Sequence, residues 1–196
     1  MKEYINLGRN QLGKVLEDQG LNGFGIEIGV AMGTFSEILL NNTKIKKMYF
    51  VDPWKEYPRE IYNDATNCSQ KEQDGRYEYV VKRLEKYGDR SEIIRKDSIE
   101  ALNDFPDEYF DFIYIDANHA YEFAKVDVNN WYPKLKEGGL FAGHDYFNGT
   151  TRHGVYGVKR AVDEFCEDKN IVPLITTGTR RCPASWYFLK NSSGEI

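Results

Sequence analysis

Short apolar runs alternate with helical patterns along most of the chain, and this alternation restricts the possible folds more than any other feature. Five runs lie at residues 23–29, 48–52, 91–97, 109–116 and 140–146. Segments with helical periodicity separate them, which is typical of a parallel sheet covered by helices on both faces. Two further runs, at 171–176 and 185–189, predict a terminal antiparallel hairpin. The pattern therefore predicts an α/β fold.

The length and charge of the chain narrow the classes of protein that it can form. With 196 residues it can bury a sizeable core, so we expect one domain, residues 1–196, with an N-terminal helix within residues 1–22. The formal net charge of −5 argues against nucleic acid as the main partner, because such binding depends on Lys and Arg. No long apolar stretch or signal-peptide pattern is seen, so we expect a cytoplasmic protein that does not insert into a membrane.

Two connections are longer than the roughly two to six residues that are usual between a strand and a helix. They cover residues 53–76, after the second run, and residues 146–156, after the fifth. The carboxyl ends of the strands face the ligand crevice in an open parallel sheet. We therefore predict that both segments cover a substrate site, although local helical turns with a packing role would have the same lengths.

A turn with three glycines, GIEIGVAMGTFS at residues 25–36, follows the first predicted strand. Gly29 lets the backbone approach a ligand, and Gly33 permits close packing where the next helix begins. A dinucleotide-binding fingerprint would have glycine in place of Glu27, whose carboxylate suits a ligand with an ammonium group and no phosphate. The pattern resembles motif I of the class I S-adenosylmethionine (SAM)-dependent methyltransferases. This resemblance implies that SAM is bound by Glu27, Gly29, Gly33 and Ser36.

Acidic residues end the second and third runs. Asp52 closes the second, where a carboxylate can accept both hydrogen bonds of a ribose diol. Asp97 and Ser98 follow the third, and the same resemblance implies that the Asp97 side chain and the Ser98 backbone N–H bind adenine. Asp97 followed by Glu100 is also a variant of the capping box, so a purely structural role at the start of a helix fits equally well.

The longest resemblance begins at the fourth run. Residues 111–146, DFIYIDANHAYEFAKVDVNNWYPKLKEGGLFAGHDY, resemble the methyltransferase family 24 type of small-molecule O-methyltransferase, and GVKRAVDEF at 157–165 matches the family's next helix. The resemblance implies a Rossmann-like three-layer sandwich with a seven-stranded, mostly parallel sheet of order 3-2-1-4-5-7-6 and an antiparallel C-terminal hairpin. It also implies O-methylation of a small hydroxylated molecule, such as a sugar or a glycosylated metabolite.

Polar residues follow the fourth and fifth runs, where a methyl acceptor would lie. Asp116, His144 and Asp145 could hold a divalent cation such as Mg²⁺, as the resemblance to sugar O-methyltransferases implies. Those relatives have an Asp-Asp pair where this chain has His144-Asp145, and a histidine favours transition metals or no metal. Alternatively, His144 or His119 is the general base, with Asp145 beside it. A third possibility is that His119 only contacts the cofactor and caps a helix, while His144 is a wall residue.

Two other functions fit parts of the sequence. A NAD-dependent oxidoreductase would use a similar glycine turn, but Glu27 argues against it. A non-catalytic SAM-binding module would lack the chemistry but keep the acidic residues expected to bind the cofactor, which are Glu27, Asp52, Asp97 and Asp116. The leading hypothesis is a SAM-dependent methyltransferase with a small-molecule acceptor, and a homo-oligomer is compatible with it.

Overall fold

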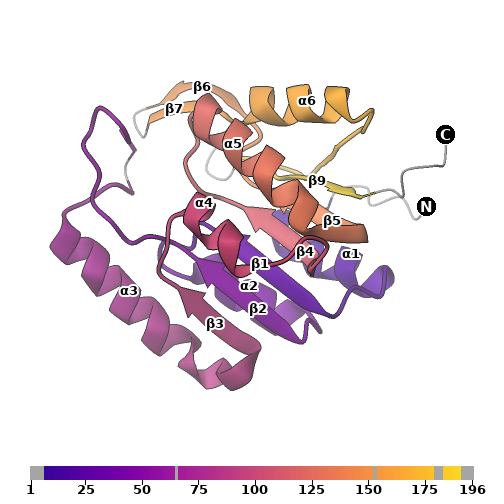
Figure 1. Cartoon of the computed structure of the whole chain (residues 1–196), viewed down its shortest axis with the longest axis horizontal. Helices are drawn as coiled ribbons and strands as arrows, with labels where there is room; N and C mark the ends of the chain where they lie inside the picture. Colours follow the sequence, from indigo (N-terminus) through magenta and orange to yellow (C-terminus); the bar gives the residue numbers. More distant parts are fainter. Residues whose placement is uncertain (1–6, 65, 152–153, 179–182, 191–196) are drawn as a thin grey trace.

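A seven-stranded sheet forms the centre of the computed structural model, which describes residues 7–64, 66–151, 154–178 and 183–190. Its strands are β1 (Phe24–Ile28), β2 (Lys47–Val51), β3 (Ser91–Ile94), β4 (Phe110–Ile115), β5 (Leu135–Gly143), β8 (Leu174–Ile175) and β9 (Trp186–Leu189). Their spatial order is β3-β2-β1-β4-β5-β9-β8 (Figure 1). The first five strands pair in parallel, whereas β9 is antiparallel to both β5 and β8. The predicted order is therefore confirmed, with β8 and β9 as its sixth and seventh strands.

Helices cover both faces of the sheet, as the alternation of runs predicts (Figure 1). They are α1 (Leu12–Asp18), α2 (Thr34–Asn42), α3 (Gln70–Leu84), α4 (Ser98–Ala101), α5 (Tyr121–Trp131) and α6 (Val158–Asp168). One apolar cluster joins the sheet to α4, α5 and α6, and a second joins it to α1, α2 and α3. Successive side chains of β4 divide between the two clusters, Ile113 in the first and Tyr114 in the second. Burial on both faces explains why these strands are almost continuously apolar.

The structure refines several predicted boundaries. Helix α1 lies within residues 1–22, where an N-terminal helix was predicted, and a 3-10 turn, Arg9–Gln11, precedes it; residues 1–6 lie outside the described part. The segment 53–76 is irregular only as far as Ser69, because Ser69 and Glu72 form a capping box that starts α3 at Gln70. Helix α5 ends at Trp131, and a 3-10 turn that contains Pro133, Tyr132–Lys134, follows it directly.

The segment 146–156 contains strands that the sequence analysis missed. β6 (Asn148–Thr151) and β7 (Gly154–Gly157) form a two-stranded antiparallel hairpin, and residues 152 and 153 lie outside the described part. All four residues of β6 are exposed, so the alternation of apolar and polar residues that identifies a strand is missing there. Whether this hairpin and residues 53–69 act as lids stays a prediction, as does the single domain. Every helix in the described part of the chain is too short or too polar to cross a membrane.

Gly29→Ala is expected to destabilise the fold far more than Gly20→Ala. Both glycines have left-handed φ values, 88° at Gly29 and 70° at Gly20. An added Cβ would lie 2.1 Å from the Asp116 carbonyl oxygen at Gly29, whereas no atom lies within 4 Å of it at Gly20. We expect a loss of about 1 kcal/mol for Gly20→Ala and about 3 kcal/mol or more for Gly29→Ala. Urea unfolding measures both, and equal losses would mean that Gly29 does not constrain the contact between β1 and β4.

Candidate active site

A cavity of about 640 Å³ lies where the carboxyl ends of β1 to β4 meet. Polar residues that end these strands line it, since parallel strands place their carboxyl ends at one edge of the sheet. Of the predicted site residues, its lining includes Glu27, Gly29, Asp52, Asp97, Ser98, Asp116, His119 and Asp145. Gly33, Ser36 and His144 are also described in the structure but contribute no lining surface. The sheet therefore brings most of the predicted residues to one place.

Glu27 is a buried carboxyl group in the floor of the cavity. Its side chain is only 1% exposed and accepts a hydrogen bond of 2.5 Å from the hydroxyl group of Ser36, which lies on α2. Burial raises the pKa of Glu27 from 4.5 to about 8, against the lowering effect of this hydrogen bond. Glu27 is therefore protonated at neutral pH in the absence of a ligand. A ligand cation would favour the charged form.

Asp52 is held by the backbone of the glycine turn. One carboxylate oxygen accepts hydrogen bonds of 2.9 Å from the N–H groups of Val30 and Ala31, and the other accepts one of 2.8 Å from Trp54 N–H. Burial raises the pKa of Asp52, although these three backbone N–H groups oppose the shift. These bonds hold the carboxylate in one orientation in the cavity wall, so it is available to a ligand without rearrangement.

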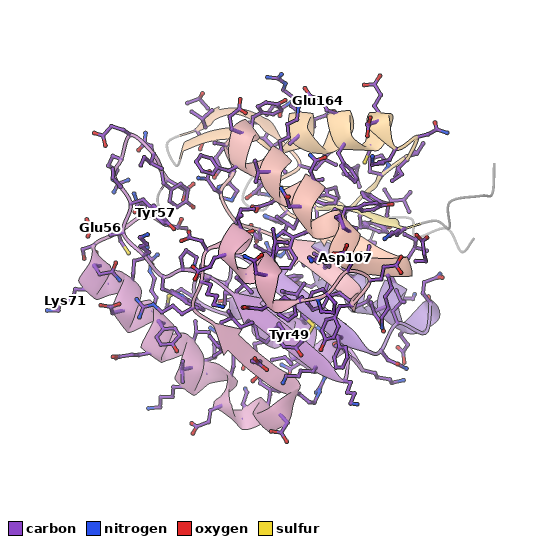
Figure 2. The ribbon with its side chains drawn as sticks, in the orientation of Figure 1. Tyr49, Glu56, Tyr57, Lys71, Asp107 and Glu164 are labelled. Atoms are coloured by element: carbon purple, nitrogen blue, oxygen red, sulfur yellow. The ribbon has the colours of Figure 1, made fainter. Side chains whose placement is uncertain are left out.

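Trp54 and Tyr57 lie in the segment after β2, where an aromatic residue could stack on an acceptor or pack the segment. Trp54 is 1% exposed, and its indole N–H donates a hydrogen bond of 2.9 Å to the Ala31 carbonyl, so it has a packing role. Tyr57, labelled in Figure 2, lines the cavity and donates a hydrogen bond to Asp97. Asp97 makes no side-chain hydrogen bond to the start of α4, which removes the capping alternative for this residue.

His119 lies between carboxylates from three parts of the chain. Its Nδ1 is 3.2 Å from Asp64 and its Nε2 is 2.8 Å from Asp145, while Asp116 lies 3.8 Å from Nε2. The ring also stacks on Tyr156, with ring centres 4.6 Å apart. Burial alone lowers the pKa of His119, but its interactions with the three carboxylates raise it far above 6.5. These carboxylates therefore favour the imidazolium form of His119.

Asp116, His144 and Asp145 form a compact set of possible metal ligands. Each offers a ligand atom within 4.8 Å of the other two. His144 is 7% exposed, and its Nδ1 lies 3.0 Å from Asp145 and 3.8 Å from Asp116. Two carboxylates and an imidazole suit Mn²⁺, Fe²⁺, Co²⁺ or Zn²⁺, whereas Mg²⁺ prefers oxygen ligands alone. The residues thus fit a divalent cation, and the histidine favours a transition metal.

Arg9, Asp64 and Asp127 lie at or beside the cavity and were not among the predicted site residues. Arg9 lies 3.5 Å from Asp116 and places its guanidinium 4.2 Å from the centre of the Phe35 ring. Asp64 comes from the segment after β2, and Asp127 comes from α5. Arg9 and Asp127 line the cavity, and Asp64 reaches it through His119. Arg9 and Asp64 have no sequence pattern that marks them, whereas Asp127 lies on the buried face of α5.

Comparisons with known proteins agree with this geometry. Residues 26–146, more than half of the chain, match methyltransferase family 24, which is described as a methyltransferase domain. A stretch of 69 residues is 35% identical to an uncharacterised protein, y4gI, of Sinorhizobium fredii, and covers 35% of this chain but only 8% of that protein.

Solved structures share the fold over nearly the whole chain. An O-methyltransferase from Bacillus cereus in complex with S-adenosylhomocysteine (SAH) has a TM-score of 0.66 and 15% identity, covering 96% of this chain and 84% of that one. TomG, an O-methyltransferase of tomaymycin synthesis from Streptomyces achromogenes in complex with SAM, has a TM-score of 0.60 and 12% identity, covering 93% and 79%. The family match extends from β1 to the end of β5 and so includes every strand end that lines the cavity. The chain therefore belongs to methyltransferase family 24 and is a class I SAM-dependent methyltransferase.

Proposed function

We propose that this enzyme transfers the methyl group of SAM to a hydroxyl oxygen of a small molecule, such as a sugar or a glycosylated metabolite. The observation that carries the proposal is the cluster of Asp116, His144 and Asp145 at the cavity. An acceptor hydroxyl must lose its proton, and such a cluster can assist that loss. The two solved structures described above are O-methyltransferases, which supports the same reaction. Family membership favours it over an oxidoreductase.

The residues of the cavity have complementary roles toward the parts of SAM. Glu27 accepts a hydrogen bond from the ammonium group of the methionine part, and Asp52 accepts hydrogen bonds from the ribose hydroxyl groups. Asp97 and Ser98 bind the adenine, which requires Tyr57 to share Asp97 or to move away. Arg9 lines the same cavity and binds the methionine carboxylate, since its guanidinium is the natural partner of such a group. Gly33 and Ser36 act indirectly by shaping the turn and orienting Glu27.

Asp116 and Asp145 line the cavity and would hold a divalent cation together with His144. Such a cation would supply Lewis acidity, which lowers the pKa of an acceptor hydroxyl. Methyl transfer is an in-line displacement, so the remaining task of the protein is to align the acceptor and exclude water. Tyr57 and Tyr62 line the same cavity, and Tyr156, which follows β5, stacks on His119. These three side chains are therefore suited to align the acceptor and exclude water.

A general base is the alternative to a cation. His144 would need a lone pair on the nitrogen that faces the acceptor, with Nδ1 donating its proton to Asp145, 3.0 Å away. A cation between the carboxylates instead requires the lone pair on Nδ1. The two roles therefore need opposite tautomers of His144. A base must also come within hydrogen-bond distance of the acceptor, and the buried His144 contributes no surface to the cavity, which favours the role of ligand.

His119 is unsuited to the role of base. Both of its ring nitrogens face carboxylate oxygens, those of Asp64 and Asp145, and so both donate protons. No lone pair is left to accept a proton from a substrate. Its charge instead balances the carboxylates at the ends of β4 and β5 and holds Asp64, on the segment after β2, against the site.

A direct test uses the purified enzyme with SAM labelled on the methyl group. We expect the label to appear as a methyl ether on one hydroxyl group of an acceptor from a panel of monosaccharides, nucleotide sugars and glycosylated metabolites. Mass spectrometry detects the product, and NMR assigns the methylated atom. Transfer to nitrogen or carbon in place of oxygen would contradict the proposed reaction.

Asp52→Ala is expected to weaken binding of SAH by roughly 1.5–3 kcal/mol, because hydrogen bonds to a charged acceptor are lost. Titration calorimetry measures this effect. Asp52→Asn serves as the comparison, since it keeps one acceptor oxygen for the backbone N–H groups of the turn and removes the charge. Urea unfolding without ligand separates damage to the turn from loss of the ribose contact. Unchanged affinity in both variants would show that Asp52 does not bind the ribose.

A further inference from the structure

A buried carboxylate on α5 has no role in the chemistry described above. Asp127 is 5% exposed and lines the cavity next to Ser98. One of its oxygens accepts a hydrogen bond of 2.5 Å from the Ser98 hydroxyl, which in turn accepts one of 2.8 Å from the Trp131 indole N–H. Burial raises the pKa of Asp127 to about 6, against the effect of Ser98. Its described hydrogen bond is to a neutral hydroxyl, so the buried charge would gain from a further donor in the cavity.

Apolar side chains line the same part of the cavity. Ile99 follows Ser98 on α4, and Phe123 and Val126 lie close to Asp127 in sequence on α5. All three line the cavity, with exposed fractions of 44%, 43% and 45%. Large apolar side chains that remain this exposed in a cavity wall are suited to contact with a flat ring. The start of α4 and the cavity-lining side of α5 thus combine apolar walls with polar groups at Asp97, Ser98 and Asp127.

We propose that Asp127 accepts a hydrogen bond from the exocyclic amino group of the cofactor's adenine and so makes the enzyme specific for adenine. This inference rests on the placement of adenine beside Asp97 and Ser98 under the proposed function. Asp97 already accepts a hydrogen bond from Tyr57, whereas Asp127 is held only by Ser98 among its described contacts. Hypoxanthine carries a carbonyl oxygen in place of the amino group. A carboxylate facing that oxygen would repel it.

The test compares binding of SAH and S-inosylhomocysteine, which differ at the exocyclic group and at N1, where hypoxanthine carries a hydrogen, so the effect of Asp127 is taken from the change in preference between wild type and variant. Titration calorimetry at pH 8 is suitable, because Asp127 is then ionised. We expect the wild-type enzyme to prefer SAH by about 10²-fold or more, since a site built around one hydrogen bond rejects a ligand that cannot make it. Asp127→Asn can donate to the carbonyl oxygen, so the preference should shrink by at least about tenfold, with SAH weaker and the inosyl ligand tighter.

Two controls keep the outcome decisive. Glu122→Gln alters an exposed carboxylate on the same helix and should leave the preference unchanged. If Asp127→Asn does not fold, Asp127→Ser keeps a group that can bond to Ser98 and removes the carboxylate, and it should lose the preference as well. Equal weakening of both ligands would mean that Asp127 only holds α4 against α5, which overturns the proposal. Failure of the wild type to bind SAH would instead contradict the placement of the cofactor.

Discussion

Chelation with EDTA is expected to abolish methyl transfer, and Mn²⁺ or Co²⁺ should restore it better than Mg²⁺. The reason is the set of ligand atoms from Asp116, His144 and Asp145, all within 4.8 Å of one another. Two carboxylates and one imidazole favour a transition metal over Mg²⁺. The enzyme should also bind one such cation per chain without an acceptor. Equilibrium dialysis followed by elemental analysis measures this binding independently of turnover.

Asp145→Asn is the most informative variant of this site. It removes the charge but keeps a residue type that tolerates the left-handed φ of 51° at this position. We expect cation affinity to fall by about 10²-fold or more. Loss of a side chain that coordinates the cation should cost at least as much affinity as loss of a side chain that only holds a coordinating residue in place. Turnover should fall with it. Asp104→Asn, on an exposed carboxylate that pairs with Lys96 away from the cavity, is the matched control and should bind the cation normally.

A metal-free base would give the opposite pattern. EDTA would then leave turnover unchanged, dialysis would find no bound cation, and His144→Gln would lower turnover by about 10²–10⁴-fold. The cofactor affinity of His144→Gln should stay close to that of the wild type, since His144 contributes no surface to the cavity. Full activity in EDTA would therefore remove the cation from the proposed function and assign the proton to His144.

The α/β class was predictable from the buried runs and the order of the sheet from the family resemblance, because neither depends on exact boundaries. Boundaries depend on local signals instead. The capping box of Ser69 and Glu72 is such a signal, and it starts α3 at Gln70, six residues before the end of the predicted connection at residue 76. The hairpin of β6 and β7 had no such signal, since β6 is exposed along its whole length. It is specified by antiparallel pairing with β7 and by the elements packed beneath it.

The candidate site was predictable where its residues end strands, as Asp52, Asp97 and Asp116 do, because topology alone brings strand ends together. Arg9 comes from a 3-10 turn and Asp64 from the segment after β2, neither of which ends a strand, so only tertiary packing places them at the site. Asp127 is different. Ala124, Val128 and Trp131 are buried on α5, and Asp127 falls on the same helical face. An acidic residue on an apolar helix face could have been recognised as a site residue from the sequence.

Glu27 should make the stability of the ligand-free enzyme fall as the pH rises from about 4.5 to about 8. The folded protein retains the proton of Glu27 up to its raised pKa of about 8, whereas the unfolded chain releases it near 4.5. The unfolded state therefore binds fewer protons in this window, and stability decreases with pH. The shift corresponds to a loss on the order of 5 kcal/mol across the window. Glu27→Gln cannot titrate, so its stability should vary much less over the same range.

Cofactor binding should reverse this protonation, because the ammonium group of SAM favours the ionised form of Glu27. Below pH 8, cofactor binding should therefore release about one proton. The cofactor affinity should increase by up to tenfold for each unit by which the pH rises. Asp116, Asp52 and Arg9 also act on Glu27, the two carboxylates raising its pKa and Arg9 lowering it. Comparison with Glu27→Gln isolates the contribution of Glu27 itself. Calorimetry at pH 6.5 in two buffers of different ionisation enthalpy counts the protons, and an equal count for wild type and Glu27→Gln would show that Glu27 does not receive the ammonium group.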